Sequence, residues 1–575
     1  MLHLRLGDLG DEKRAEWAAA GIRLPRFGCA AMRAATLANP SWVHFGAGNI
    51  FRGFIASLSQ ELLDQKLEER GIIAVEPFDF EIIDRIYGPH DCLSLSVGLR
   101  ADGTCDSAVV ASIAAAYKAD FSDAAQAGAL KRIFRSPGLQ LASLTITEKG
   151  YALTGIDGGL LPAAAADMEC GPRAMAGTGS AGSAGGAAAA GAMEADPRAA
   201  AAGGEGAGKF LRHSIGMLTA LLLERYEAGA RPIALVSMDN FSRNGEQLRR
   251  AVLAMAQAWQ ERGFCGAGFI EYLGDGGKVS FPWTMIDKIT PRPSESVQRR
   301  LAEGGLALEP IATAKGTFIA PFVNAEIPQY LVIEDSFPNG RPPLEKAGVR
   351  FANRESVDNV ERMKVTTCLN PLHTALAIFG CLLGYRLIAD EMADPDLRAL
   401  AERTGFSEGM PVVPGQDIID PAAFLRELLD ERLPNPSMPD TPQRIATDTS
   451  LKLPIRFGET LKSYAARDDL DPRRLECIPL ILAAWCRYLL GADDELAPME
   501  LSGDPRLPEL RRLLESVAAG KPESYRGQLR PLLANSVVFG ADLYAVGLGE
   551  RVESLFVEML RGKGAVRRLL HKTVG

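Results

Sequence analysis

A strand, a glycine turn and a helix follow one another near the start of the chain, and they constrain its fold more than any other feature. The apolar run from Trp42 to Phe45 leads into the turn GAGNIFRG, and apolar residues then recur with helical spacing. A second apolar run, GIIAVEPFDF, follows this helix. Strand, crossover helix and strand form a right-handed unit of a parallel sheet. The sequence therefore predicts an α/β protein with an N-terminal Rossmann-like, doubly wound domain.

Later parts of the chain extend this pattern and then change it. Further strand candidates are LQLASLTITEKGY, RPIALVSMDN and QYLVIEDSF, with helical stretches between them. After about Asn353 the chain is rich in helical periodicity and poor in β-branched runs. We therefore expect an NAD-binding domain over residues 1–353 and a mostly α-helical substrate and catalytic domain over residues 354–575.

An Ala/Gly-rich segment interrupts the first domain at about residues 162–208. Such a segment has little apolar surface to bury and much backbone entropy to lose on ordering. It also contains no aromatic residue, lysine or histidine that would contact a ligand. We expect a disordered surface insertion.

Composition and residue counts exclude several classes of function. A net charge of −9 leaves no broad basic face to offset phosphate repulsion, so no nucleic-acid partner is expected. No apolar run reaches membrane length, and the N-terminal stretch has no apolar signal region, which favours a cytoplasmic protein without a membrane partner. The nine cysteines include no CxxC pair, and the six histidines show no HxxxH or HExxH spacing, so no metal site is expected.

The glycine turn is a candidate cofactor site. Gly46 would allow the tight turn, and Gly48 would let backbone N–H groups approach a pyrophosphate at the helix N-terminus. The usual third glycine falls at Phe51, so an ordinary strand-to-helix turn is the alternative. Glu76 ends the second strand, where a carboxylate would accept hydrogen bonds from the ribose hydroxyls and favour NAD over NADP. Its distance from the glycines exceeds the usual twenty or so residues, and Asp79 competes for the role.

Two further stretches carry groups suited to proton transfer. Asn240 follows Asp239 at the end of a predicted strand, where doubly wound sheets place functional groups; an Asx turn that caps the next helix explains Asp239 equally well, but Asn240 less well. ERMKVTTCLNPLH carries Lys364 on an apolar-patterned helix, where a lysine removed from water can take a hydroxyl proton. A solvated lysine and a core histidine at His373 are the alternatives.

Seven stretches in order resemble the long-chain polyol dehydrogenases, which include mannitol 2-dehydrogenase, fructuronate reductase and tagaturonate reductase. They are HFGAGNIFRGF, TITEKGY, VSMDNFSRNG, FPWTMIDKITP, QYLVIEDSFPNGRP, ERMKVTTCLNPLH and TSLKLPIRF. The resemblance implies metal-independent hydride transfer with NAD, in which a lysine is the acid/base and two asparagines hold the reacting oxygen. The catalytic set matched by motif comprises Lys364, Asn240, Asn370, His373 and Glu361, the last tuning proton release. The implied cofactor set comprises Gly46, Gly48, Asn49, Ile50, Arg52, Glu76, Thr147 and Glu148.

One departure from the family has a structural consequence. Five residues separate Lys364 from Asn370, where the family usually has four. On a straight helix, the nine-residue step to His373 advances about 900° and puts the two side chains on opposite faces, whereas eight would leave them roughly 80° apart. Pro371 cannot continue a helix without a local break. We therefore predict a π-bulge or kink between Lys364 and Pro371 that brings the two side chains to one pocket.

The resemblance implies a sugar acid or polyol as the substrate. Lys452 and Arg456 in TSLKLPIRF resemble the KLPxR segment of the hexuronate reductases, and either cation could bind a carboxylate; a solvated basic pair is the alternative. The resemblance also places Asp287 in the substrate pocket. It favours D-mannonate/D-fructuronate interconversion, with mannitol 2-dehydrogenase or tagaturonate reductase as runner-up.

Partners beyond the small-molecule substrate are not expected, and the protein should be a monomer or weak oligomer. The extra residue after Lys364 leaves open a different class, a catalytically weakened NAD-binding relative with a regulatory role.

Overall fold

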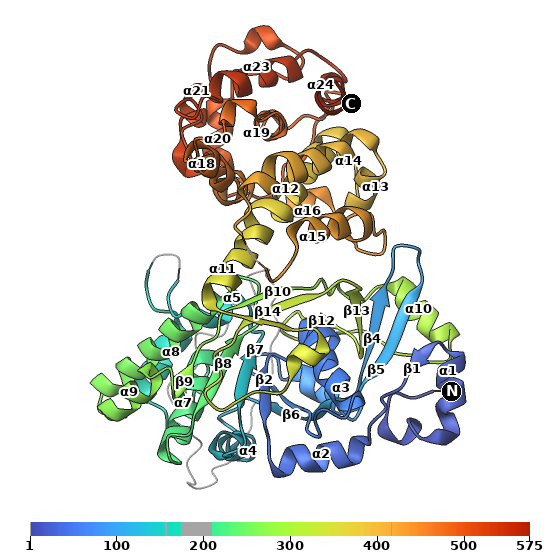
Figure 1. Ribbon diagram of the computed structural model, residues 1–575, viewed down its shortest axis with the longest axis vertical. Helices are drawn as coiled ribbons and strands as arrows, with labels where there is room; N and C mark the ends of the chain where they lie inside the picture. The colour runs from blue at the N-terminus through green and yellow to red at the C-terminus, as the bar shows by residue number, and fades with distance from the viewer. Residues whose placement is uncertain (1, 156–157, 174–209, 416) are drawn as a thin grey trace, which may run out of the picture. The chain divides into compact units, whose positions relative to one another are not determined.

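The computed structural model describes residues 2–155, 158–173, 210–415 and 417–575 (Figure 1). The chain divides into two compact units, Met1–Leu99 with Cys105–Val357, and Arg100–Thr104 with Asp358–Gly575. The predicted domain boundary between residues 353 and 354, with a cofactor-binding domain before it and a substrate and catalytic domain after it, stays a prediction.

The first unit is built on a six-stranded parallel sheet, which confirms the doubly wound fold. Its strands, in spatial order, are β6 (Ile113–Lys118), β3 (Ile72–Glu76), β2 (Trp42–Phe45), β7 (Leu141–Leu144), β8 (Ile233–Ser237) and β9 (Val279–Ser280). From β2 the chain runs outward to β3 and β6, and from β7 it runs outward to β8 and β9. The order therefore reverses between β2 and β7, and ligands of open α/β sheets bind beyond the carboxyl ends of the strands at such a point.

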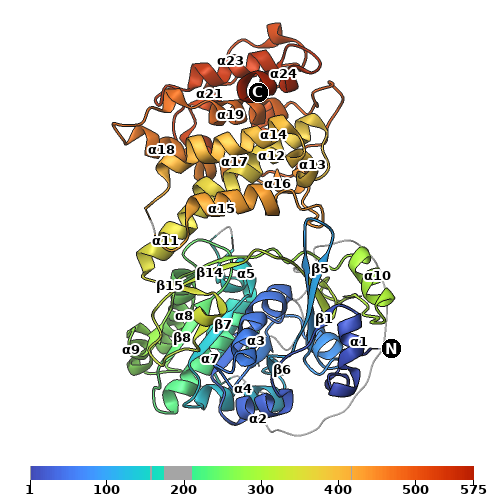
Figure 2. The ribbon, with the colours of Figure 1, turned by 45° about the vertical axis from the view of Figure 1, so that its right-hand side comes forward.

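Helices with apolar inner faces cover both faces of this sheet, which explains why all its strands except the end of the outer strand β6 are buried. Val43 and Phe45 of β2 join a core with Trp259, whereas Trp42 joins a second core with Phe54. Alternate residues of a strand point to opposite faces, so one short strand serves both cores. The covering helices include α3 (Ala56–Asp64), α4 (Ala124–Arg135), α7 (Ser214–Glu227) and α8 (Asn244–Glu261) (Figure 2).

The predicted strand that begins at Gln329 forms, but outside the doubly wound sheet. It is β14 (Tyr330–Glu334), which pairs antiparallel with β10 (Thr284–Asp287) and parallel with β15 (Arg350–Ala352). This three-stranded sheet is separate because β14 pairs with β10 and β15 and not with the outer strand β9. Another sheet has the order β1 (Ile22–Arg23), β5 (Cys105–Val110), β4 (Ser94–Leu99) and β13 (Phe322–Glu326).

Part of the predicted disordered insertion is a helix, so the expectation was wrong at its start. Pro162–Cys170 form α6, which begins on a proline and buries Ala164 and Met168. The Asp167 carboxylate accepts hydrogen bonds from the backbone N–H groups of Arg212 and His213. These contacts with residues far along the chain order a segment whose composition alone suggests a coil. The rest of the expected insertion, residues 174–208, lies outside the described residues.

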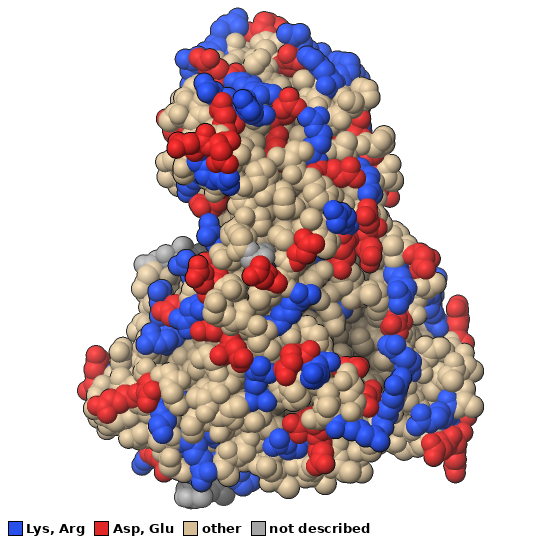
Figure 3. Space-filling view, in the orientation of Figure 1, with Lys and Arg blue, Asp and Glu red and all other residues tan. Residues whose placement is uncertain are grey.

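The second unit is helical, as predicted. Its central helix is α19 (Cys477–Tyr488), every residue of which is buried. Around it pack α12 (Asn370–Leu383), α23 (Gly549–Met559) and α24 (Ala565–Val574). Residues 354–383 are long and apolar enough to cross a membrane, but 78% of their apolar window is buried inside the protein, as in a core helix. On the face drawn in Figure 3, acidic and basic side chains are interspersed.

Candidate active site

The glycine turn has the geometry of a dinucleotide-binding turn. Gly46 has a φ of 108°, and a Cβ added there would lie 2.2 Å from the Thr145 carbonyl oxygen. Only glycine fits this conformation and this close approach. Gly48 is different, because a Cβ added there would meet nothing within 4 Å. Open space beside this backbone is what the approach of a pyrophosphate requires, so the turn fits NAD.

Arg52 and Asn49 fix the helix that follows the turn. The Arg52 guanidinium is 1% exposed and donates to Asn49 Oδ1 at 2.8 Å and to the Ala320 carbonyl at 2.7 Å. Burial lowers the Arg52 pKa to about 10, which leaves the group charged at neutral pH. Arg52 thus holds Asn49 in place, while direct contact of Asn49, Ile50 and Arg52 with a cofactor stays a prediction.

Glu76 joins the glycine turn to the loop after β3. One carboxylate oxygen accepts from the Ala47 N–H at 2.9 Å, and the other accepts from Phe78 at 2.8 Å and Asp79 at 3.0 Å. Burial raises the pKa of this carboxyl, and the three backbone bonds oppose that shift. The competing Asp79 is buried and accepts from the Thr313 hydroxyl at 2.6 Å. Glu76 is therefore an organiser of the turn, and its bond to ribose stays a prediction.

The ends of β7 and β8 meet beside this turn. The Asp239 carboxylate accepts from the backbone N–H groups of Ile146 at 2.8 Å and Thr147 at 3.1 Å. Thr147 has a φ of 62°, a strained conformation for a β-branched residue. Thr147, Glu148 and Asn240 are exposed. Sequence analysis treated Asp239 only as a neighbour of Asn240, and the hydrogen bonds show that it shapes the loop.

The variant Gly48→Ala tests cofactor binding separately from folding. We expect Gly48→Ala to leave the thermal unfolding midpoint of the free protein within about 2 °C, because the added methyl group meets no atom. The same methyl would occupy the space of the pyrophosphate and raise the NADH Kd about tenfold or more. NADH fluorescence titration measures this. An equal NADH Kd for the wild type and Gly48→Ala would contradict a pyrophosphate site at this turn. Gly46→Ala is the matched control, which we expect to impair folding.

In the second unit, the predicted break after Lys364 is present. Met363–Cys368 form a π-helical turn, in which the Leu369 N–H donates to the Lys364 carbonyl at 3.1 Å, and α12 begins at Asn370. One extra residue is absorbed by the wide turn, so the angle between Lys364 and His373 falls from about 180° to about 80°. The predicted π-bulge is confirmed, whereas a shared pocket for the Lys364 and His373 side chains stays a prediction. The Lys364 side chain is 2% exposed, and Glu361 lies one turn before it.

Asn370, His373 and Arg456 lie together in this unit. The Arg456 guanidinium donates to the Asn370 carbonyl at 3.3 Å and to the Thr374 hydroxyl. His373 Nε2 lies 4.0 Å from Asp440 Oδ2. Burial lowers the His373 pKa, and the cations Arg456, Arg432 and Arg444 add to this effect while Asp440 opposes it. His373 is therefore neutral at neutral pH.

Lys452, one turn before Arg456, is held by backbone. Its Nζ donates to the carbonyls of Ile445, at 3.0 Å, and Thr447. Burial and the nearby Arg456 lower its pKa to about 8. Among the described residues, neither Lys452 nor Arg456 has an acidic side chain within ion-pair distance. The nearby acids Asp448 and Asp504 oppose the lowering of the Lys452 pKa, so among the described residues Arg456 is the cation of this pair without an acidic partner.

Sequence reasoning missed Asp440 and Thr374, which contact the predicted residues. Thr374 lies four residues after Asn370, so helical spacing could have indicated it. Asp440 lies in a loop far along the chain, and no sequence signal indicates it. Asn240 and Asp287, which is 5% exposed, belong to the first unit, and Lys364, Asn370, His373, Lys452 and Arg456 belong to the second. No group of three or more His, Cys, Asp or Glu side chains suited to a metal occurs in the described parts of the chain.

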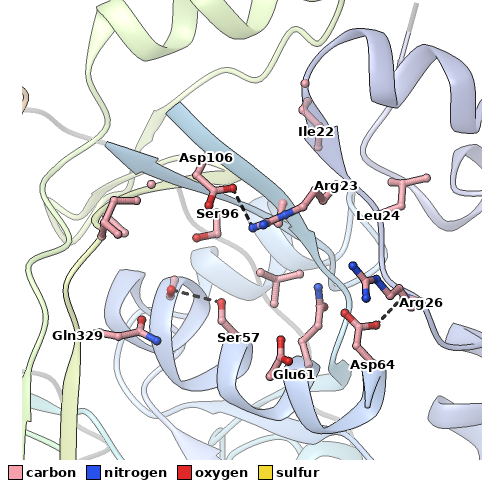
Figure 4. Close-up of a pocket in the computed structure, with 18 of the residues that line it drawn as sticks. Ile22, Arg23, Leu24, Arg26, Ser57, Glu61, Asp64, Ser96, Asp106 and Gln329 are labelled. Carbon is pink, nitrogen blue, oxygen red and sulfur yellow. Dashed lines mark hydrogen bonds and ion pairs between the residues drawn. The ribbon is translucent and has the colours of Figure 1, made fainter. Parts of the chain in front are cut away.

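A cavity of about 860 Å³ in the first unit is lined by none of the predicted site residues (Figure 4). Its lining contains four basic and four acidic residues, and Arg23 pairs with Asp106 at 2.9 Å. The cavity therefore shows no preference for a charged ligand.

Comparison with known proteins places the chain in a family. Residues 40–346 match the family described as the mannitol dehydrogenase Rossmann domain, and residues 356–555 match the mannitol dehydrogenase C-terminal domain. A D-mannonate oxidoreductase from Thermotoga maritima is 49% identical over 100% of this chain and 99% of its own length. A solved structure of Pseudomonas fluorescens mannitol 2-dehydrogenase, a ternary complex with NAD and D-mannitol, has a TM-score of 0.65 and 24% identity, and covers 99% of each chain.

The chain belongs to the mannitol dehydrogenase family. It is an oxidoreductase that acts on a CH–OH group of a sugar acid or polyol, as the resemblance predicted. A D-sorbitol dehydrogenase structure shares the fold, with a TM-score of 0.72, 22% identity and coverage of 97% of this chain and 98% of that one.

Proposed function

We propose that the protein is an NAD-dependent D-mannonate oxidoreductase, which interconverts D-mannonate and D-fructuronate. The observation that carries the proposal is the 49% identity to the Thermotoga maritima D-mannonate oxidoreductase over essentially the whole of both chains. Arg456 supports an acidic substrate, because a half-buried guanidinium without an acidic partner is a ready site for a carboxylate.

The proposed mechanism assigns a role to each predicted group. NAD, when bound, accepts the hydride from the substrate carbon. Lys364 takes the hydroxyl proton in the oxidative direction and returns it in reduction. The side-chain amides of Asn240 and Asn370 hold the reacting oxygen. Neutral His373 supports that oxygen by hydrogen bonding, and Glu361 relays the proton away from Lys364.

Further parts of the proposal concern the surroundings of the reaction. Asp287 would bind substrate hydroxyl groups, and Thr147 and Glu148 would contact the cofactor. The protein would act in the cytoplasm as a monomer or weak oligomer, on a small-molecule substrate and without a metal.

A substrate screen tests the proposal. NADH oxidation is measured with fructuronate, tagaturonate and fructose under identical conditions. We expect the highest kcat/KM with fructuronate. A higher value with fructose would identify a mannitol 2-dehydrogenase, a higher value with tagaturonate a tagaturonate reductase, and either result would overturn the assignment.

Arg456 should discriminate acidic from neutral substrates. We expect Arg456→Ala to raise KM for fructuronate roughly 10–100-fold, since a charge-assisted hydrogen bond contributes about 1.5–3 kcal/mol. KM for fructose, measured with the same variant, should change less than about threefold. Arg456→Lys serves as the control that keeps the charge. Its KM for fructuronate should lie between those of the wild type and Arg456→Ala. Equal changes with both substrates would show that Arg456 supports Asn370 and α12 and does not bind the carboxylate.

A further inference from the structure

Two polar residues lie side by side in the middle of the parallel sheet. His44 of β2 and Ser143 of β7 are register partners, and each is 0% exposed. Central strands of such sheets are usually apolar, because a buried polar group is costly unless it is hydrogen-bonded. β2 and β7 are also the two strands between which the strand order reverses.

These residues belong to a continuous chain of hydrogen bonds. The Trp42 indole donates to Ser143 Oγ at 2.7 Å, and Ser143 Oγ lies 2.6 Å from His44 Nδ1. His44 Nε2 lies 2.8 Å from Thr145 Oγ1, which donates to the Gly46 carbonyl at 3.3 Å. With the imidazole proton on Nε2, every hydroxyl proton in this chain has an acceptor, so the network assigns that tautomer.

The hydrogen-bonded series around His44 is packed against the helix after the turn and carries no charge. The His44 ring stacks on Phe51, the first residue of the helix after the turn, with ring centroids 4.1 Å apart and planes 5° from parallel. Burial lowers the His44 pKa to about 3, so the ring carries no charge at physiological pH. A neutral ring between two hydroxyl groups keeps one fixed direction of donation.

One end of this series of hydrogen bonds reaches backbone of the candidate cofactor site. It ends on the carbonyl of Gly46, whose backbone passes against Thr145. Thr145, the member of the series before Gly46, begins the loop that continues into the strained Thr147, whose N–H donates to Asp239. The loop after β7 is therefore tied to β2 through His44 and to β8 through Asp239.

We propose that His44 is a positioning residue for the nicotinamide dinucleotide, acting through Thr145 to set the spacing between the glycine turn and the loop after β7. The inference rests on the proposed role of this sheet edge in NAD binding. Loss of the bond to His44 leaves the half-buried Thr145 hydroxyl with only the Gly46 carbonyl as a partner and frees both backbone segments to shift. Small displacements of a binding turn weaken ligand binding even where no contacting group is removed.

The test compares His44→Phe, which keeps the flat ring over Phe51 but removes both nitrogens, with His44→Gln, whose amide nitrogen can still donate towards Thr145. We expect His44→Phe to raise the NADH Kd and the KM for NAD about tenfold, with kcat and the KM for the sugar acid changed less than threefold. His44→Gln should restore binding to within about threefold. Thr145→Val should mimic His44→Phe, and the double variant should be no weaker than the single ones, because both act on one bond.

His213→Gln is the matched control. His213 is also a buried histidine of the first unit, and its ring accepts from the Ile215 N–H at 3.2 Å and contacts the Ala152 carbonyl at 3.0 Å. We expect it to lower the unfolding midpoint without changing NADH binding. NADH binding by His44→Phe within twofold of the wild type would overturn the inference, as would an equal loss in His213→Gln. If His44→Phe does not fold, Thr145→Val decides in the same way. Failure of the wild-type protein to bind NADH would instead contradict the proposed cofactor, and the inference with it.

Discussion

We expect replacement of Lys364 with methionine to lower kcat about 10²–10⁴-fold, the usual contribution of a general acid–base group. The amine is carried on a side chain that is only 2% exposed, so water cannot readily take its place. Methionine keeps the apolar stem and removes only the amine, which limits the effect on packing. The expected signature is a lower kcat with an NADH Kd within about twofold of the wild type, because the lysine is not assigned to cofactor binding.

Lys462→Met is the control for this change. Lys462 lies in the same unit on α18 (Glu459–Ala465), where its side chain is 51% exposed and pairs with Glu459 at 2.7 Å. A surface pair of this kind contributes little, so activity and stability should both be retained. Wild-type turnover in Lys364→Met across the pH range would end the assignment of the acid/base. The hydroxyl proton would then have to be exchanged by a group other than Lys364.

Local pattern was enough to predict the frame of the fold. The strand from Trp42 to Phe45, the glycine turn and the following helix are specified by neighbours in sequence, and so is their parallel pairing. β14 was predicted as a strand, but its sheet was not, because strand partners are chosen by tertiary contacts. The same limit explains α6, whose Asp167 is bonded to residues 45 and 46 positions away.

The site was predictable where covalent geometry dictated it. A count of residues between Lys364 and Asn370, together with Pro371, required a break in the helix, and the π-turn at Met363–Cys368 supplies it. The bond from Arg456 to Thr374 and the chain through His44 join positions 82 and 99 to 101 residues apart. Sequence shows these side chains but not their proximity, so His44 was noted only as part of a motif.

Glu391 should make the second unit lose stability as the pH rises, even though no catalytic role falls to it. It lies on α13 (Ile388–Met392), is 0% exposed, and neither carboxyl oxygen has a hydrogen-bond partner among the described residues. Its packing is tight, since a Cβ added at Gly380 of α12 would lie 2.0 Å from Glu391 Oε1. Burial, together with a smaller effect of the neighbouring acids Asp390 and Asp394, raises the Glu391 pKa from 4.5 to about 9.

The sign of the effect follows from the proton that folding takes up. Between pH 4.5 and about 9 the folded unit holds a proton on Glu391 that the unfolded chain releases, so the free energy of unfolding falls as pH rises. The slope is about 1.4 kcal/mol per pH unit, which gives a loss of roughly 3 kcal/mol between pH 6 and pH 8. Glu391→Gln removes the titrating group and should abolish this part of the pH dependence, as urea unfolding measured at both pH values would show.

Glu408→Gln is the contrasting change, because Glu408 is buried in the same unit but accepts hydrogen bonds from the backbone N–H groups of Glu476, Cys477 and Ile478 at the start of α19. We expect it to destabilise the unit at pH 8, by about 1–3 kcal/mol, because a carboxylate suits these donors better than an amide. Glu391→Gln should stabilise the unit at the same pH. If Glu391→Gln and the wild-type protein lose the same stability between pH 6 and pH 8, the buried carboxyl must be ionised or hydrated in the folded protein. Glu391 would then not cause the loss of stability of this unit at high pH.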